Sequence, residues 1–124
     1  MTCAIIGDSI AIGLAALMPQ CVVDAKVGIP SAAVIYRMHS ADIVVVSAGS
    51  NDPRNPRLVD NLKLIRATAL GKVIWIAPID RAAAKAVASV AAIHSDPVIH
   101  FEPGHDNVHP RSDVTLAAAV KGEM

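Results

Sequence analysis

Hydrophobic and polar positions divide the chain into short apolar runs separated by longer stretches with helical spacing. The apolar runs that we expect to form strands are residues 3–6, 21–27, 42–47, 72–77 and 98–102. The segments 43–46 and 73–76 are continuously apolar rather than alternating, which is typical of strands covered on both faces. The pattern therefore predicts a parallel sheet enclosed between two layers of helices.

The stretches between the apolar runs carry recognisable helix signals. Caps are expected at Asn55, Asp80 and Ser112, ahead of helices that reach Gly71, His94 and Val120. In the first of these helices, with Pro56 at its first position, one buried stripe is expected to hold Leu58, Leu62, Ile65 and Ala69. A helix is also expected to begin at Ser9, and a shorter one after Pro30 that ends before Asp42.

The alternation of strands and helices over 124 residues predicts one α/β domain, spanning residues 1–124. Short connections imply right-handed crossovers and hence a three-layer α/β/α sandwich. With five parallel strands, we expect the flavodoxin-like order 2-1-3-4-5. In that order a crevice opens between strands 1 and 3 at their carboxyl ends, which directs attention to the loops that follow residues 6 and 46.

Composition narrows the classes of partner. Lysines and arginines number 11, aspartates and glutamates also number 11, and no basic block is present, so we expect no nucleic-acid partner. No apolar run is long enough to span a bilayer, and the apolar start lacks the basic region of a signal peptide. Cys3 and Cys21 are expected to be reduced and buried. Together these features predict a cytoplasmic protein without a membrane partner.

Residue types suited to acyl transfer follow four of the five predicted strands. Ser9 comes directly after the first strand, and Asp106 and His109 lie three residues apart after the last. A hydroxyl nucleophile needs a base to take its proton and a carboxylate to orient that base, and these three residues supply both. Donors for the developing oxyanion are available from the backbone N–H groups of Ser9 and Gly28 and from the side-chain amide of Asn51.

Four sequence blocks resemble those of the SGNH (GDSL-type) hydrolase family. They are Gly7-Asp8-Ser9, the glycine at position 28, Gly49-Ser50-Asn51-Asp52 and Asp106-Asn107-Val108-His109, in the order of the family. The resemblance implies a serine esterase with Ser9, Asp106 and His109 as catalytic residues. It implies an oxyanion hole of Ser9, Gly28 and Asn51, and a structural hydrogen-bonding role for Asp52. The substrate would be a small acyl ester, cleaved in an open site without metal or cofactor.

Each of these residues also has a structural interpretation. On this interpretation Ser9 is no more than a helix cap, Asn51 no more than a turn residue before Pro53, and His109 a surface histidine. His105, Asp106 and His109 could bind a metal, although the neighbouring prolines disfavour a helix there. The arginines after the site loops, Arg54, Arg57 and Arg111, fit either an anionic substrate or solvated surface charge.

Two alternative functions compete with the esterase. A catalytically silent member of the same fold would serve as a binding or assembly module. A flavodoxin-like nucleotide binder would use the same helix amino ends, but the chain has no glycine-rich phosphate loop. The distance between Ser9 and His109 separates the esterase from the silent module.

Overall fold

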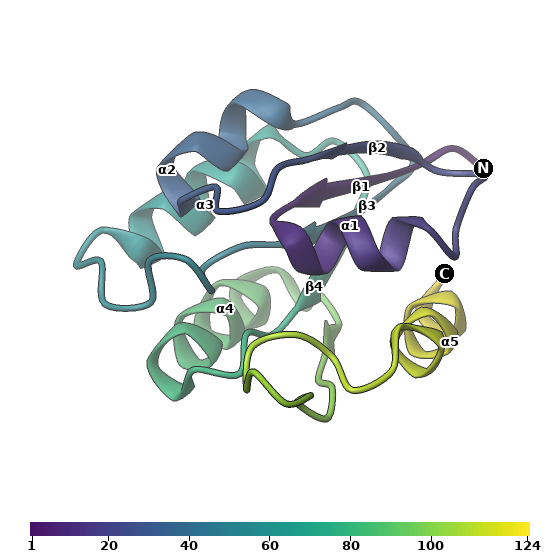
Figure 1. Ribbon diagram of the computed structural model, residues 1–124. Helices are drawn as coiled ribbons and strands as arrows, with labels where there is room; N and C mark the ends of the chain where they lie inside the picture. The colour runs from purple at the N-terminus through teal and green to yellow at the C-terminus, as the bar shows by residue number, and fades with distance from the viewer.

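The computed structural model describes residues 1–124 and contains one five-stranded parallel sheet (Figure 1). The strands are β1 (Cys3–Gly7), β2 (Val22–Ala25), β3 (Ile43–Ser47), β4 (Lys72–Ile76) and β5 (Val98–Ile99). Their order in the sheet is β2-β1-β3-β4-β5, and every neighbouring pair is parallel. The predicted strand order is therefore confirmed.

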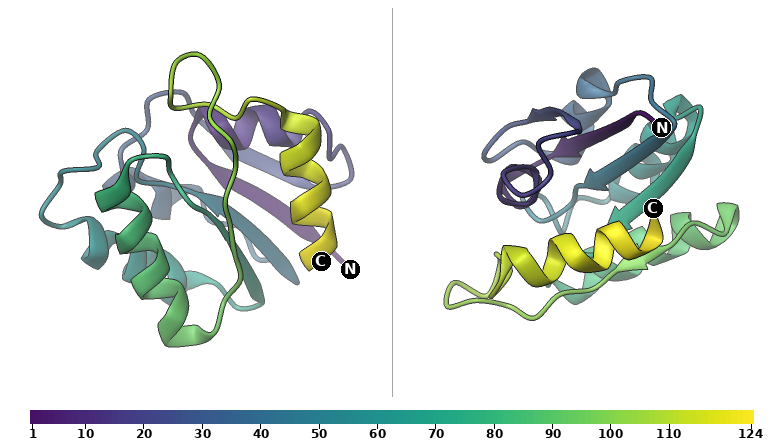
Figure 2. Two further views of the ribbon diagram at one scale, coloured as in Figure 1. Left: turned by 90° about the horizontal axis from the view of Figure 1, so that it is seen from below. Right: turned by 90° about the vertical axis from the view of Figure 1, so that its right-hand side faces the viewer.

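Helices cover both faces of the sheet. They are α1 (Ser9–Ala15), α2 (Ser31–Val34), α3 (Leu58–Thr68), α4 (Arg81–His94) and α5 (Asp113–Glu123), with a 3-10 turn η1 (Ile35–Arg37) after α2. Helices α1 and α5 lie on one face, and α2, α3 and α4 lie on the other (Figures 1 and 2). This arrangement is the predicted three-layer α/β/α sandwich.

The core consists of two apolar clusters, one on each side of the sheet. Successive strand residues point to opposite faces, so Val44 packs beneath α3 and α4 while Val45 packs beneath α1 and α5. Neither valine is exposed to solvent. Full burial of such a side chain contributes about 1.5–3 kcal/mol, which explains why the run at 43–46 carries no polar residue.

The main departures from the predicted bounds are in two strands and one helix. The β2 strand ends at Ala25, and β5 has only two residues because the chain then turns into a hairpin, where the Arg111 N–H donates to the Glu102 carbonyl at 2.8 Å. Helix α3 begins at Leu58, because Asn55 forms a turn in which its side chain accepts from the Arg57 N–H at 2.9 Å. The caps predicted at Asp80 and Ser112 are confirmed.

Cys3 and Cys21 form a disulfide, so the prediction that both are reduced is wrong. Their sulfur atoms are 2.05 Å apart and their Cα atoms 4.8 Å apart. The register of β1 and β2 pairs Ala4 with Val22, which places the two preceding cysteines side by side. Both half-cystines are buried beneath the layer that contains α1.

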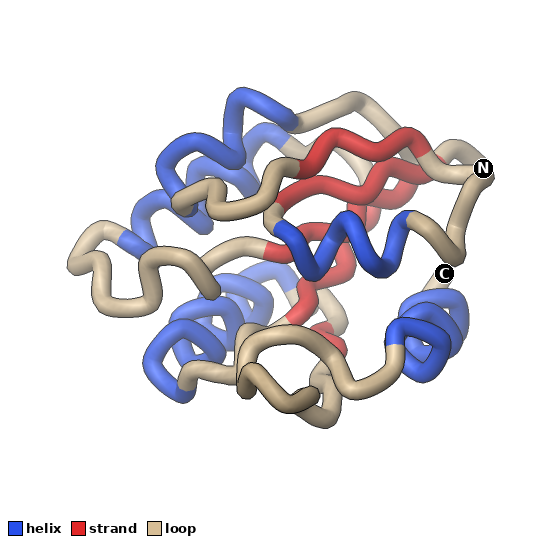
Figure 3. Tube along the Cα trace, in the orientation of Figure 1, coloured by secondary structure: helices blue, strands red, loops and turns tan.

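The loops that follow the strands gather at one end of the sheet. In Figure 3 the loops leading into α2 and α3 lie at the end away from the two chain termini. The hairpin between β5 and α5 reaches the same end, because His109 touches Ser9 there.

No helix of the structure has both the length and the apolar character needed to cross a bilayer.

Candidate active site

Ser9 is the first residue of α1, at the point where β1 gives way to the helix. The turn begins at Gly7, which has φ +136°, and a Cβ atom there would lie 1.8 Å from the Ser47 carbonyl oxygen. The cap of α1 is Asp8, whose carboxylate accepts from the Ile10 N–H at 3.1 Å. The Ser9 hydroxyl is therefore free of the capping role and makes a different contact.

Asp8 is a buried carboxylate that joins the first loop to the loop after β3. It is 1% exposed, and it accepts hydrogen bonds from the Ser47 hydroxyl at 2.8 Å and the Ser50 hydroxyl at 2.7 Å. These contacts hold the turn that presents Ser9 against the segment that leads to Asn51. Sequence reasoning did not identify this role, although an aspartate just ahead of a helix is a common cap signal.

Ser9 and His109 form a hydrogen bond across 100 positions of sequence. The Ser9 Oγ lies 2.7 Å from Nε2 of His109, and Nδ1 of the same ring lies 2.5 Å from Oδ2 of Asp106. An ionised carboxylate can only accept, so Asp106 fixes the proton of His109 on Nδ1. Nε2 then presents its lone pair to the Ser9 hydroxyl, which is the geometry required of a general base.

The charge of Asp106 is held by three hydrogen bonds. Besides the His109 ring, its carboxylate accepts from the N–H groups of Val108 at 3.0 Å and His109 at 2.9 Å. The bond to the His109 side chain is the largest cause, and the two backbone N–H groups add to it, so the pKa of Asp106 lies well below its ordinary value. The carboxylate therefore stays ionised and keeps the imidazole oriented.

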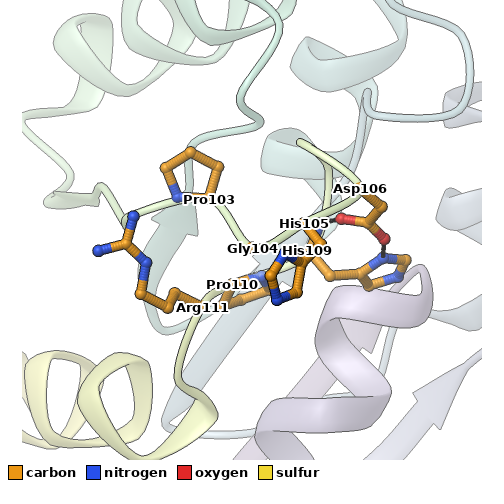
Figure 4. A pocket seen from close by; sticks show the side chains of 7 residues that line it. All are labelled: Pro103, Gly104, His105, Asp106, His109, Pro110 and Arg111. Atoms are coloured by element: carbon orange, nitrogen blue, oxygen red, sulfur yellow. Dashed lines mark hydrogen bonds and ion pairs between the residues drawn. The ribbon is translucent and has the colours of Figure 1, made fainter.

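A closed hairpin positions both Asp106 and His109. Pro103 and Pro110 form an antiparallel bridge, and within it the Gly104 N–H donates to the His109 carbonyl at 2.8 Å. In Figure 4 the Asp106 carboxylate faces the His109 ring, and both belong to this hairpin. The side chains of His109 and Asp106 are 45% and 53% exposed, so the site is open to solvent.

The two other proposed oxyanion donors lie on loops that contact each other. The Asn51 side-chain amide donates to the Ile29 carbonyl at 3.0 Å, next to Gly28. Gly28 has φ +78°, is exposed, and has open space where a Cβ would be. A side-chain amide has two N–H groups, so the bond to Ile29 leaves Asn51 with one further donor.

Asp52 ties the loop after β3 to the start of α2. It accepts from the Ser31 N–H at 3.0 Å, from the Ser31 hydroxyl at 2.6 Å and from the Asn55 amide at 2.9 Å. The structural role expected for Asp52 is confirmed by these bonds. Since Ser31 follows Gly28 by three residues, the same contacts also hold the glycine loop beside Asn51.

Comparison of the sequence with family models and with curated proteins finds no match. Among solved structures, the chain is similar to the C-terminal catalytic domain of peptidoglycan O-acetyltransferase A (OatA) from Streptococcus pneumoniae, described with a methylsulfonyl adduct. The TM-score is 0.55 and the sequence identity 21%, over 76% of this chain and 61% of that domain. The likeness is one of fold.

The structure also bears on the possible metal ligands and on the three arginines that follow the site loops. No group of three or more His, Cys, Asp or Glu side chains is arranged to hold a metal ion. Arg57, just ahead of α3, lies 3.5 Å from Asp60 of its first turn in an exposed ion pair. Arg54 is exposed and makes no ion pair, whereas Arg111 lines a pocket with His109.

Proposed function

We propose that the chain is a serine esterase of the SGNH (GDSL) type that hydrolyses short-chain acyl esters through an acyl-serine intermediate. The observation that carries this proposal is the hydrogen bond of 2.7 Å between Ser9 Oγ and His109 Nε2, with Asp106 on the other ring nitrogen. A hydroxyl, a base and an orienting carboxylate in this relation form the machinery of acyl transfer. A silent binding module has no need of it.

The first half of the reaction forms the acyl-serine. His109 Nε2 takes the proton of the Ser9 hydroxyl while Oγ attacks the ester carbonyl carbon, and the carbonyl electron pair moves onto oxygen. When this tetrahedral intermediate collapses, the bond from carbon to the alcohol oxygen breaks. The imidazolium of His109 returns its proton to that oxygen, and the alcohol leaves.

The second half releases the acid and restores the enzyme. His109 takes a proton from water, the resulting hydroxide oxygen attacks the acyl carbon, and the Ser9 oxygen leaves with the proton returned by His109. In both halves Asp106 stabilises the imidazolium without taking its proton. The net reaction consumes one ester and one water and yields one carboxylic acid and one alcohol.

The oxyanion formed in both halves needs donors that are already in place. We assign this role to the N–H groups of Ser9 and Gly28 and to the free N–H of the Asn51 amide. The support is indirect but local: Asp8 bonds to Ser50, and Asn51 bonds to Ile29, so the three donors sit on loops that are tied together. Removal of one such donor typically lowers kcat by about 10²–10³-fold.

The open site favours a small acyl group on a larger alcohol. His109 and Asp106 are about half exposed, and Asn51 and Gly28 are exposed as well, so no tunnel encloses an acyl chain. The neighbour in fold is named as an O-acetyltransferase acting on peptidoglycan. An acetyl ester of a carbohydrate or of another large molecule fits both observations.

A second candidate is transfer of the acyl group to an alcohol acceptor in place of water. The name of the neighbouring domain favours it. Both reactions share the acyl-serine, so only the partner of the second half differs. Adding a primary alcohol to an ester assay separates them, since a transferase yields a new ester while a hydrolase yields free acid.

The test of the esterase is hydrolysis of p-nitrophenyl acetate by the purified protein and its variants. Ser9→Ala is expected to abolish turnover, whereas Ser89→Ala, which removes an exposed hydroxyl from α4, is expected to keep it. His109→Ala and His94→Ala form a second matched pair, because His94 is exposed at the end of α4, away from the site. Methanesulfonyl fluoride should add one methylsulfonyl group to the wild type but none to Ser9→Ala. Equal turnover in wild type and Ser9→Ala would contradict the proposal.

A further inference from the structure

The largest pocket of the molecule lies against the hairpin that carries His109. Its volume is about 580 Å³, compared with 400, 300 and 290 Å³ for the three other pockets. The residues that line it are Pro103, Gly104, His105, Asp106, His109, Pro110 and Arg111. A pocket of this volume lies within the range of small-molecule sites, yet no large apolar side chain lines it.

The chemistry of His109 suggests what this pocket binds. In the proposed reaction the Nε2 of His109 delivers a proton to the oxygen of the departing alcohol, so the alcohol must lie beside the imidazole. The oxyanion donors assigned above lie on other loops, at Gly28 and Asn51. The pocket is lined by His109 and its hairpin and by none of the assigned oxyanion donors, so it borders the residue that would protonate the departing alcohol.

Two uncompensated donor side chains face this space. Neither Arg111 nor His105 makes a side-chain hydrogen bond or an ion pair within the protein. Figure 4 places the His105 ring between His109 and Arg111, with the guanidinium at the far end of the pocket beside Pro103. An extended alcohol could therefore reach from His109 past His105 to the guanidinium.

None of the carboxylates near the pocket forms an ion pair with Arg111. Asp106 lines the wall, but both its oxygens accept hydrogen bonds from the Val108 and His109 segment. Glu102 lines a separate hollow that Arg111 also borders, and no ion pair joins the two side chains. The Asp113 carboxylate lies against Gly13 of α1. Arg111 is thus the free charge at this end of the pocket.

We propose that this pocket binds the alcohol portion of the substrate, and that Arg111 selects alcohols carrying a carboxylate. A guanidinium matches a carboxylate through two parallel N–H donors, and His105 supplies a further donor along the way. The proposal rests on the proposed esterase function and adds a substrate class to it: acyl esters whose alcohol is polar and anionic.

The test compares two esters that differ only in charge, p-acetoxybenzoate and its neutral methyl ester. The measured quantity is the ratio of their kcat/KM values, because the intrinsic difference in reactivity between the two esters cancels when this ratio is compared between variants. We expect Arg111→Gln to lower the ratio of charged to neutral ester about fivefold, as for a partly exposed ion pair. Arg54→Gln is the matched control, because Arg54 is exposed, unpaired and outside every pocket, and its ratio should equal that of the wild type.

The outcomes separate this inference from the esterase proposal. If the wild type cleaves the neutral ester but the ratio is the same in Arg111→Gln, the anionic alcohol site is wrong and the esterase stands. If neither ester is cleaved, the esterase proposal falls, and binding of p-hydroxybenzoate followed by NMR decides the pocket. Shifts of the His105 ring signals that vanish in Arg111→Gln would support the site, and their absence from the wild type would overturn it.

Discussion

The Asp8 carboxylate accepts a hydrogen bond of 2.7 Å from the Ser50 hydroxyl, so the residue before Ser9 is tied to the residue before Asn51. This bond crosses from the end of β1 to the end of β3, the two strands between which the crevice of this strand order opens. It couples the proposed nucleophile to a proposed oxyanion donor through buried polar contacts. This carboxylate therefore helps to set the relative position of the two groups, beside the backbone pairing of β1 with β3.

Removing that carboxylate should destabilise the protein and weaken catalysis together. Asp8→Ala deletes a helix cap and leaves the Ser47 hydroxyl buried without its acceptor, so we expect the free energy of unfolding to fall by about 2–4 kcal/mol. Urea denaturation measures this loss. Asp60→Ala, an exposed carboxylate on α3, should change stability by less than about 0.5 kcal/mol. A stable Asp8→Ala variant with full activity would contradict the coupling.

Gly7 should tolerate no side chain. A Cβ at this position would lie 1.8 Å from the Ser47 carbonyl oxygen, which is backbone in the adjacent strand and cannot move aside without parting β1 from β3. We expect Gly7→Ala to be poorly folded, as judged by circular dichroism and thermal unfolding. Gly122→Ala is the matched control in α5, where a Cβ meets nothing within 4 Å, and it should be neutral or stabilise by up to about 1 kcal/mol.

The pH profile of the proposed esterase should show a single ionisation on its acid side. The His109 side chain, followed by the backbone N–H groups of His109 and Val108, lowers the pKa of Asp106. A lowered pKa keeps the carboxylate charged at lower pH than usual, and the charge is lost only when the pH falls through that lowered value. We therefore expect Asp106 to add no second ionisation to log kcat/KM for p-nitrophenyl acetate, whose slope should not exceed one in the acid range of the profile.

A steeper fall, with slope two in that range, would show that Asp106 takes up a proton with the base. Asp106→Asn tests the same carboxylate at constant pH. An amide can hold His109 in the wrong tautomer, so we expect kcat to fall by about 10²–10⁴-fold. Asp60→Asn provides the control, since that carboxylate lies on the outer surface of α3.

The disulfide should stabilise the fold by closing a loop around α1. It links residues 18 apart, and a crosslink of that span contributes about 3 kcal/mol by restricting the unfolded chain. We expect the double variant Cys3→Ser, Cys21→Ser to have a lower urea midpoint than the oxidised wild type. Reductant should lower the wild-type midpoint and leave the double variant unchanged. Equal midpoints for all forms would show that the crosslink contributes nothing.

The disulfide also bears on where the protein works. Stable disulfides are typical of oxidising compartments. The cytoplasmic location expected from the sequence relied partly on reduced cysteines, so that part of its support is removed and the location stays a prediction. Fractionation of cells, with thiols labelled before and after reduction, would test location and oxidation state together.

Much of the fold could be predicted because its signals are local. Continuous apolar runs such as 43–46 reveal strands buried on both faces, and Asp80 and Ser112 cap helices through residues three positions away. The disulfide was missed because it depends on the register of β1 against β2, which no short window shows. The start of α3 was missed because Asn55 bonds within its own turn instead of capping a helix.

The site, like the fold, could be predicted where its contacts are local in sequence and not where they are distant. The pair of Asp106 and His109 is visible in sequence because the two residues are three apart. The contact between Ser9 and His109 depends on the whole sheet and on the hairpin from β5, and the resemblance to a known family anticipated it where spacing alone could not. The buried role of Asp8 was not anticipated, because its partners Ser47 and Ser50 lie 39 and 42 residues away.

The hairpin between Pro103 and Pro110 makes the acid and the base a self-contained unit. Apart from the bond between the His109 ring and Ser9, the bonds that orient His109 arise within the hairpin, from Asp106 and from the Gly104 N–H that holds the His109 backbone. A change in the sheet or in the helices can shift this unit as a body without disturbing its internal arrangement. The hairpin therefore depends on the rest of the fold for one thing above all, which is the distance from His109 to Ser9.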